Sequence, residues 1–228
     1  MKKILTKIKE EKIIFSKAIN FDKYDSKEDL LYRLNSDLFE NNKLNHKKRN
    51  QFLNKLRKLL IDENLDFLVA HNLALSSKVE QELGNIKNAI KKSTDSYELF
   101  KTLYSSNQLA VNGSIFAYSN LANIYSSLNL NNISLDYLYK AQKAIEQCEN
   151  DYIPKIRINL NLGICFHKLG KYQKSLKYFS EIYNIAFKKK DYMILIPIIV
   201  NTSSVYFSMK NFDKCLELNN RALEFLEK

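Results

Sequence analysis

The stretch NLGICFHKLGKYQKSLKYFSEIY, residues 161–183, places small and aromatic residues at intervals that fit helix packing. Leu162 and Phe166 are four residues apart and fall on one helix face, where Gly163 leaves room for a partner helix. Gly170 can end this helix in a left-handed conformation. The apolar residues after it recur at spacings of three and four, and they are Leu176, Phe179, Tyr183 and Ala186. The stretch therefore predicts a helical hairpin.

The same pattern occurs three times along the chain. Residues 120–142, NLANIYSSLNLNNISLDYLYKAQ, align with it, as does the segment NTSSVYFSMKNFDKCLELNNRALEF from Asn201. The aromatic residues Tyr125, Phe166 and Tyr206 take the same place and are 41 and 40 residues apart. Neither helix of such a unit can bury its apolar face alone, so the units are expected to stack into a shared core.

Fainter copies precede these three. One is predicted to turn at Gly84-Asn85, and the one before it begins with Ser26 and Asp29, which resemble a capping box. The predicted hairpins are 26–61, 65–103, 114–149, 152–189 and 191–228. Residues 1–25 are predicted to form a separate amphipathic helical segment.

Composition supports an all-α fold. The chain of 228 residues has only four glycines and two prolines, too few for a fold with many tight turns. Hydrophobic residues make up 45% of the chain, enough for a substantial core. We therefore expect a right-handed α-solenoid of about five degenerate hairpins with a period of about 40 residues, as one domain over residues 26–228.

The motif Leu162-Gly163-x-x-Phe166, followed by Ser175-x-x-x-Phe179, resembles the tetratricopeptide pattern L-G-x-x-Y and A-x-x-x-F. The resemblance implies a protein- or peptide-binding module rather than an enzyme. Both phenylalanines are expected to fill the space between stacked hairpins.

The chain departs from the usual tetratricopeptide unit in three ways. Asn159 stands where Trp is expected, the closing Pro is missing, and the period is about 40 rather than 34 residues. Stretched repeats of this kind are similar to those of the peptide-sensing regulators of Gram-positive bacteria, the Rap/Rgg/PlcR group. The resemblance covers residues 114–228 well and 26–103 weakly. It implies a bacterial regulator that responds to a peptide, as in quorum sensing.

Four first helices carry an asparagine just before the packing pair, at Asn72, Asn120, Asn161 and Asn201. The tetratricopeptide resemblance implies that this place borders a concave groove. An amide there can donate to and accept from the backbone of an extended peptide. Asn is a mediocre helix former, so its recurrence calls for a reason. The alternative is coincidence, because Asn is common throughout the chain.

Two further residues complete the predicted peptide-binding set. Arg157 lies about one turn before Asn161, where it could form a charge-assisted bond with a peptide carboxylate or simply be solvated. Asn123 follows the asparagine of its own helix by three residues.

Charge is concentrated in the first quarter of the chain. Residues 1–60 carry 16 Lys or Arg and 8 Asp or Glu, whereas the whole chain has a net charge of +11. The alternative function is therefore a transcriptional regulator of the Rgg/PlcR type with a degenerate or missing helix-turn-helix. Nucleic acid would then be contacted by the basic helix, through Lys47, Lys48 and Arg49. The apolar stripe of that helix favours a core-facing helix with a solvated back.

Other functional classes find no support in the sequence. No catalytic constellation, phosphate-binding loop or cofactor motif occurs, and the three histidines lack metal-ligand spacing. The longest apolar run, residues 193–200, is too short to span a membrane. The cysteines Cys148, Cys165 and Cys215 are odd in number and fit buried thiols of a cytoplasmic protein. A homodimer is among the assemblies that the sequence leaves open.

Overall fold

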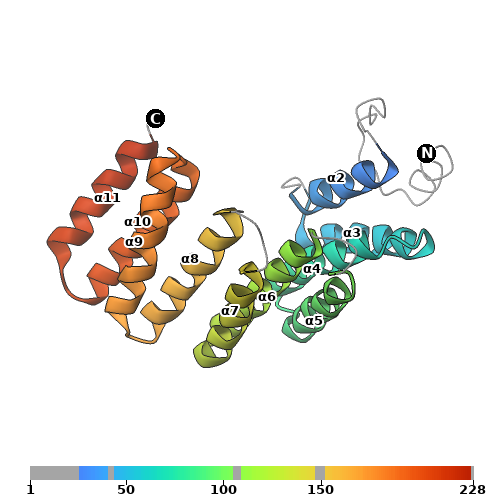
Figure 1. Ribbon diagram of the computed structural model, residues 1–228, viewed down its shortest axis with the longest axis horizontal. Helices are drawn as coiled ribbons and strands as arrows, with labels where there is room; N and C mark the ends of the chain where they lie inside the picture. Colours follow the sequence, from blue (N-terminus) through green and yellow to red (C-terminus); the bar gives the residue numbers. More distant parts are fainter. Residues whose placement is uncertain (1–25, 41–43, 105–108, 147–151, 227–228) are drawn as a thin grey trace. The chain divides into compact units, whose positions relative to one another are not determined.

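The computed structural model describes residues 26–40, 44–104, 109–146 and 152–226, which form ten helices and no strand (Figure 1). The helices are α2 Lys27–Glu40, α3 His46–Asp62, α4 Asp66–Glu82, α5 Ile86–Thr102, α6 Leu109–Ser127, α7 Asn131–Ile145, α8 Tyr152–Lys168, α9 Tyr172–Lys188, α10 Tyr192–Ser208 and α11 Phe212–Leu226. The predicted all-α class is confirmed. The predicted segment 1–25 and Cys148 lie outside the described residues.

The chain divides into two compact units. Unit 1 is Met1–Ile124, and unit 2 is Tyr125–Lys228, so the boundary falls near the end of α6. Unit 1 contains α2 to α5 and most of α6, and unit 2 contains α7 to α11. The assignment of residues 26–228 to one domain stays a prediction.

Several helices in both units are followed by a turn residue with a left-handed backbone conformation. Six residues in the described turns have a left-handed conformation, and they are Asn64, Gly84, Asn129, Gly170, Lys190 and Lys210. The N–H of Gly170 donates to the carbonyl of His167, and the N–H of Lys171 donates to that of Phe166, both at 2.9 Å. This Schellman arrangement satisfies carbonyls that a helix end would otherwise leave unpaired. The predicted turns at Gly84 and Gly170 are confirmed.

In each unit a glycine on one helix packs directly against a phenylalanine ring of a neighbouring helix. A Cβ atom on Gly113 would collide with the ring of Phe100, and one on Gly163 would collide with the ring of Phe179. The predicted role of Gly163 as a site of close approach is thus confirmed. Phe179 is almost fully buried, as predicted, and Phe166 is buried as well. Close packing of this kind fixes the distance between two helices.

A hydroxyl group joins the two helices of three hairpins at small residues twelve positions apart. Each serine Oγ donates to a backbone carbonyl on the other helix, in the pairs Ser77 to Ala89 at 2.8 Å, Ser175 to Gly163 at 2.7 Å and Ser203 to Cys215 at 3.1 Å. These bonds satisfy buried hydroxyls where the helices are too close for larger side chains.

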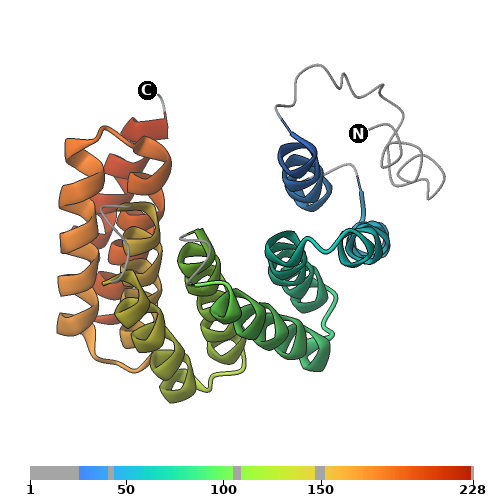
Figure 2. The same cartoon turned by 45° about the vertical axis from the view of Figure 1, so that its right-hand side comes forward.

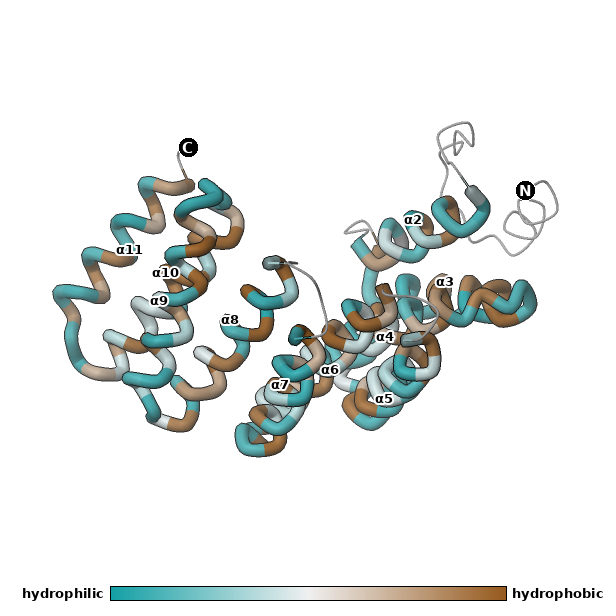
Figure 3. The backbone as a smooth tube through the Cα atoms, viewed as in Figure 1, coloured by the Kyte–Doolittle hydropathy of each residue, from teal (hydrophilic) through white to brown (hydrophobic). Residues whose placement is uncertain are grey.

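The core of unit 2 lies among α8, α9 and α10. Its buried residues are Ile156, Phe179, Ile182, Ala186, Leu195, Ile198 and Val205. Figure 2 shows α9, α10 and α11 side by side, in agreement with their contacts. Most helices change between hydrophobic and hydrophilic residues along their length (Figure 3), as expected when one face of a helix is buried.

Ser26 begins the described part of unit 1 as a helix cap. Its Oγ accepts the N–H of Asp29 at 3.0 Å, which confirms the predicted cap of α2. Leu31, Leu53, Leu56 and Leu60 then form the centre of an apolar core among α2, α3 and α4.

Candidate peptide-binding surface

Two of the four recurrent asparagines lie inside unit 1. Asn72 on α4 has no exposed surface, and its Nδ2 donates to Asn35 Oδ1 at 2.8 Å and to the Leu53 carbonyl at 3.1 Å. Asn120 on α6 is 3% exposed, and its Nδ2 donates to the Ala74 carbonyl at 2.9 Å. Both amides therefore hold helices together, and the structure does not bring them to an exposed surface.

The other two asparagines reach the surface of unit 2. Asn161 on α8 and Asn201 on α10 are both partly exposed. Asn201 Nδ2 donates to the carbonyl of Pro197 one turn earlier, at 2.7 Å, which leaves its Oδ1 as an acceptor. Arg157 is exposed on α8, one turn before Asn161. Asn123 is exposed on α6, but it lies in unit 1.

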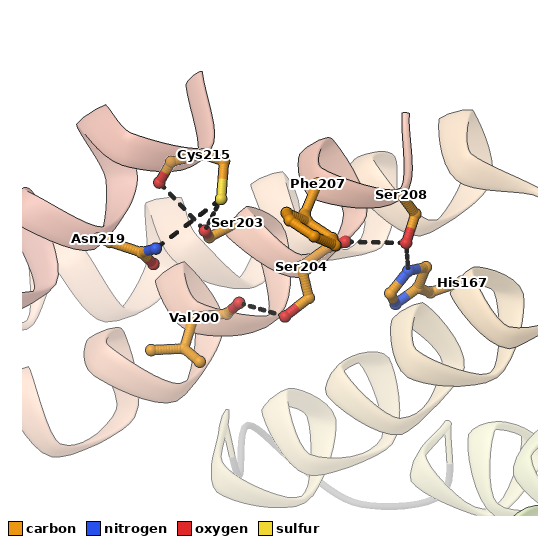
Figure 4. Close-up of a pocket in the computed structure, with 8 residues that line it drawn as sticks. All are labelled: His167, Val200, Ser203, Ser204, Phe207, Ser208, Cys215 and Asn219. Carbon is orange, nitrogen blue, oxygen red and sulfur yellow. Dashed lines mark hydrogen bonds between the residues drawn. The ribbon is translucent and has the colours of Figure 1, made fainter. Parts of the chain in front are cut away.

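A hollow of about 420 Å³ crosses α10 in unit 2 (Figure 4). It extends from the end of α8 to α11, and its lining residues are His167, Val200, Ser203, Ser204, Phe207, Ser208, Cys215 and Asn219. The wall combines the apolar side chains of Val200 and Phe207 with hydroxyl, amide, thiol and imidazole groups. The hollow therefore offers both apolar surface and hydrogen-bonding groups.

The histidine and serine at one end of the hollow form a positioning contact. His167 Nε2 lies 2.8 Å from Ser208 Oγ, and Ser208 Oγ donates to the carbonyl of Ser204 at 3.1 Å. Because the serine hydrogen is used in that second bond, the histidine ring N–H is the donor to Ser208. Burial lowers the pKa of His167, so the ring is neutral near pH 7. In this arrangement the contact fixes the orientation of the ring at one end of the hollow.

The polar groups at the other end of the hollow are also paired. Ser203 Oγ lies 3.1 Å from the thiol of Cys215 as well as from its carbonyl, and Asn219 Nδ2 lies 3.8 Å from the same sulfur. The amide oxygen of Asn219 remains directed away from these contacts. This end of the hollow can accept hydrogen bonds, and it offers no charged group.

The basic helix considered for nucleic acid is α3. Lys47 and Lys48 are exposed, whereas Arg49 is buried. Arg49 Nη1 donates to the Phe39 carbonyl at 2.8 Å, and its Nη2 donates to Glu82 at 3.3 Å. Arg49 therefore secures α3 within unit 1, which leaves two of the three predicted cations facing outward.

Sequence reasoning missed the residues that line the hollow. The available signal was the repeat alignment, which places Val200, Ser204 and Phe207 where the preceding unit has Leu160, Ile164 and His167. A polar residue at a position that is apolar one repeat earlier marks a surface that the neighbouring helix does not cover in the same way.

Two further properties of the described residues bear on function. None of those helices is both long and apolar enough to cross a membrane. Within the same part of the chain, no group of three or more His, Cys, Asp or Glu side chains is placed to hold a metal ion.

Helical hairpins with small residues at their crossing points define the tetratricopeptide-repeat class, and residues 113–188 match the tetratricopeptide repeat family model. This part of the chain is therefore similar to tetratricopeptide repeats, as the sequence predicted. A comparison with curated proteins finds no match.

Solved structures with the same fold include two of particular note. Aspartyl phosphate phosphatase F from Bacillus subtilis is similar over 87% of this chain and 51% of its own, with a TM-score of 0.71 and 16% identity. A Rap protein complexed with Competence and Sporulation Factor is similar over 86% and 54%, with a TM-score of 0.72 and 15% identity. The chain thus spans about half the length of these proteins. BtubC from P. vanneervenii also shares the fold, with a TM-score of 0.64 and 16% identity over 88% of this chain.

Proposed function

We propose that unit 2 binds an extended peptide, or the tail of a partner protein, along the exposed faces of α8 and α10. The observation that carries the proposal is the pair Asn161 and Asn201, which hold equivalent places on two first helices and are both at the surface. An extended peptide presents an N–H and a C=O at each residue, and a side-chain amide can pair with both. Arg157 on the same face of the chain can meet a carboxylate of the peptide.

The hollow next to Asn201 would give the peptide a side-chain pocket. Val200 and Phe207 provide apolar walls, and the hydroxyls of Ser204 and Ser208 keep lone pairs that can accept hydrogen bonds. Backbone contacts supply affinity in this mode of recognition, and pockets for individual side chains supply selectivity. Asn72 and Asn120 would support the fold of unit 1 rather than touch the peptide.

The fold comparison supports the same proposal. The Rap protein of similar fold was crystallised with Competence and Sporulation Factor, and tetratricopeptide folds suit peptide recognition. We propose a non-enzymatic bacterial regulator acting in the cytoplasm, in which peptide binding alters the contact with a partner. The phosphatase activity named for the Bacillus subtilis protein belongs to a chain of about twice this length.

Selection of extended peptides by display on the purified chain, followed by calorimetry, tests the proposal. Each Asn→Ala change at Asn161 or Asn201 should weaken binding of a selected peptide by about tenfold, since each amide can form two hydrogen bonds. Asn184→Ala is the matched control, because Asn184 is an exposed asparagine on the second helix α9. Equal affinities for the double variant, the control and the unmodified chain would show that the peptide binds elsewhere.

A further inference from the structure

The hairpin α8–α9 shows how one hairpin packs against the next helix, α10. Its residues Leu160, Ile164, Leu176 and Tyr183 are partly buried and pack against the core cluster to which α10 contributes Leu195, Ile198 and Val205. The cluster thus joins α10 to both helices of the hairpin, mainly to α9.

The equivalent positions on the next hairpin are uncovered in the described chain. Forty residues later, the places of Leu160, Leu176 and Tyr183 are taken by Val200, Leu216 and Leu223. These three are 46%, 63% and 59% exposed. With the exposed Phe207 and Leu226, they form what we call the α10–α11 face. The hollow over α10 lies on this face, so the surface is concave as well as apolar.

The outer side of α11 has the spacing of a helix-pairing seam. The residues of this seam lie four, three, four and three positions apart, and they are Phe212, Leu216, Asn219, Leu223 and Leu226. That is the a/d pattern through which helices pack side by side. Asn219 is the single polar member, and it is exposed at the centre. One polar residue in an apolar seam is a known means of fixing the register of a partner helix.

Acidic residues border the seam. Asp213, Glu217 and Glu224 are exposed along the same side of α11. The equivalent positions on α9 hold Gln173, Lys177 and Asn184, so the negative border is particular to α11.

The two basic residues of the described part of α11 lie over aromatic rings. Lys214 Nζ is 5.2 Å from the centre of the Tyr206 ring, and the guanidinium of Arg221 is 5.3 Å from that of Tyr183. Cation–π contacts hold both side chains toward the neighbouring helices α9 and α10. The border of the seam is therefore left with negative charge.

We infer that the α10–α11 face binds a basic amphipathic helix of a partner protein. The apolar stripe of that helix would lie in the seam with a polar residue opposite Asn219, and its Lys or Arg side chains would face Asp213, Glu217 and Glu224. The acidic border selects against a helix flanked by carboxylates, since like charges across an interface are unfavourable. This site shares the hollow over α10 with the peptide-binding function proposed above, and it goes beyond that function by adding the seam of α11 and its acidic border.

Two synthetic helical peptides with one apolar seam test the inference. One peptide is flanked by lysines and the other by glutamates, and binding to the complete 228-residue chain is measured by fluorescence anisotropy. The lysine-flanked peptide should bind at least tenfold more tightly, an advantage that falls as salt is raised. Glu217→Lys with Glu224→Lys should reverse the preference, and Leu216→Ser with Leu223→Ser should remove binding of both peptides.

Two control variants test whether binding is specific to the α10–α11 face. Glu181→Lys reverses an exposed charge on α9, and Asn161→Ala alters the other proposed surface at a position outside the hollow. Both should leave binding of the lysine-flanked peptide unchanged. Equal affinity for the two peptides, no binding of either, or insensitivity to the α11 variants would overturn the inference. The inference would also be wrong if the chain self-associated and Leu216→Ser abolished that self-association. The α10–α11 face would then bind a second copy of the chain.

Discussion

Units 1 and 2 use the same hairpin spacing but fill their interiors differently. In unit 1, Asn72 is fully buried among the amide of Asn35 and the carbonyl of Leu53. In unit 2, the equivalent Asn161 is partly exposed above a core of aliphatic and aromatic side chains. The position in the repeat is the same, and the neighbouring helix decides whether its side chain serves packing or faces solvent.

Unit 1 also buries an ion pair. Lys92 Nζ lies 2.6 Å from Glu80 Oε1, and the amides of Asn50 and Asn85 donate to the same carboxylate. Burial raises the pKa of Glu80, but the hydrogen bonds from Lys92, Asn85 and Asn50 outweigh it and hold the pKa below its usual value. A buried charge needs such partners to be tolerated. Unit 1 therefore buries a charged pair, whereas the buried polar residues of the described part of unit 2 are uncharged serines and an asparagine.

The largest expected effect tests what the two units share. Replacing Phe100 in unit 1 or Phe179 in unit 2 with Ala should lower the free energy of unfolding by ~3–5 kcal/mol each, because each ring fills the space over a glycine. Denaturant unfolding followed by circular dichroism measures the loss. Lys171→Ala, at an exposed turn residue, should change stability by less than ~0.5 kcal/mol. Similar losses for Phe179→Ala and Lys171→Ala would contradict the assigned packing.

The second expected effect is confined to unit 1 and depends on pH. His71 stacks on Tyr32 at 4.7 Å and lies 3.2 Å from Asn35, and burial lowers its pKa to about 4 from an ordinary value of 6.5. Below pH 6.5 the His71 imidazole becomes protonated in the unfolded chain, whereas in the folded chain it stays neutral until about pH 4. This group should therefore reduce stability as the pH falls through that window, by up to ~3 kcal/mol.

The comparison that isolates His71 is with His71→Gln. Gln keeps a neutral hydrogen-bonding group at the position, so the variant should lose less stability between pH 6.5 and 4 than the unmodified chain. Parallel stability curves for the two proteins would mean that another group is responsible for the pH dependence.

The sequence was sufficient to predict the helices, because their apolar periodicity and their turn residues agree. Gly84 and Gly170 adopt the left-handed conformation that such a turn requires, and Gly163 and Phe179 pack as their spacing implied. These features depend on residues within one hairpin, which a single sequence displays directly.

The site was harder to predict because exposure depends on the neighbouring hairpin. The same alignment that located Asn161 and Asn201 also located Asn72 and Asn120, which are buried. What differs is the presence of partners such as Asn35 for Asn72, and no spacing within the repeat indicates them.

The third expected effect measures this difference directly. Asn72→Ala removes an amide with two buried acceptors, so it should cost ~1–3 kcal/mol of unfolding free energy. Asn161→Ala removes a partly exposed amide and should cost less than ~0.5 kcal/mol. Thermal or chemical unfolding of the two variants side by side gives the comparison. A large loss for Asn161→Ala would indicate a structural role and weaken its proposed role in binding.

The smallest expected effect concerns the turns, where the units again differ. The left-handed residues of unit 1 are Asn64 and Gly84, which adopt this conformation readily, whereas unit 2 places Lys190 and Lys210 in two of its turns. A left-handed lysine costs ~1–2 kcal/mol, and glycine avoids that cost while adding ~0.4–1 kcal/mol of unfolded-chain entropy. Lys210→Gly should therefore stabilise the protein by ~0.5–1 kcal/mol, which corresponds to a rise in melting temperature of ~1–4 °C. Asn64→Gly in unit 1 is the matched control and should change the melting temperature little. If both changes had the same effect, the residue type at the left-handed turn position would not distinguish the turns of the two units.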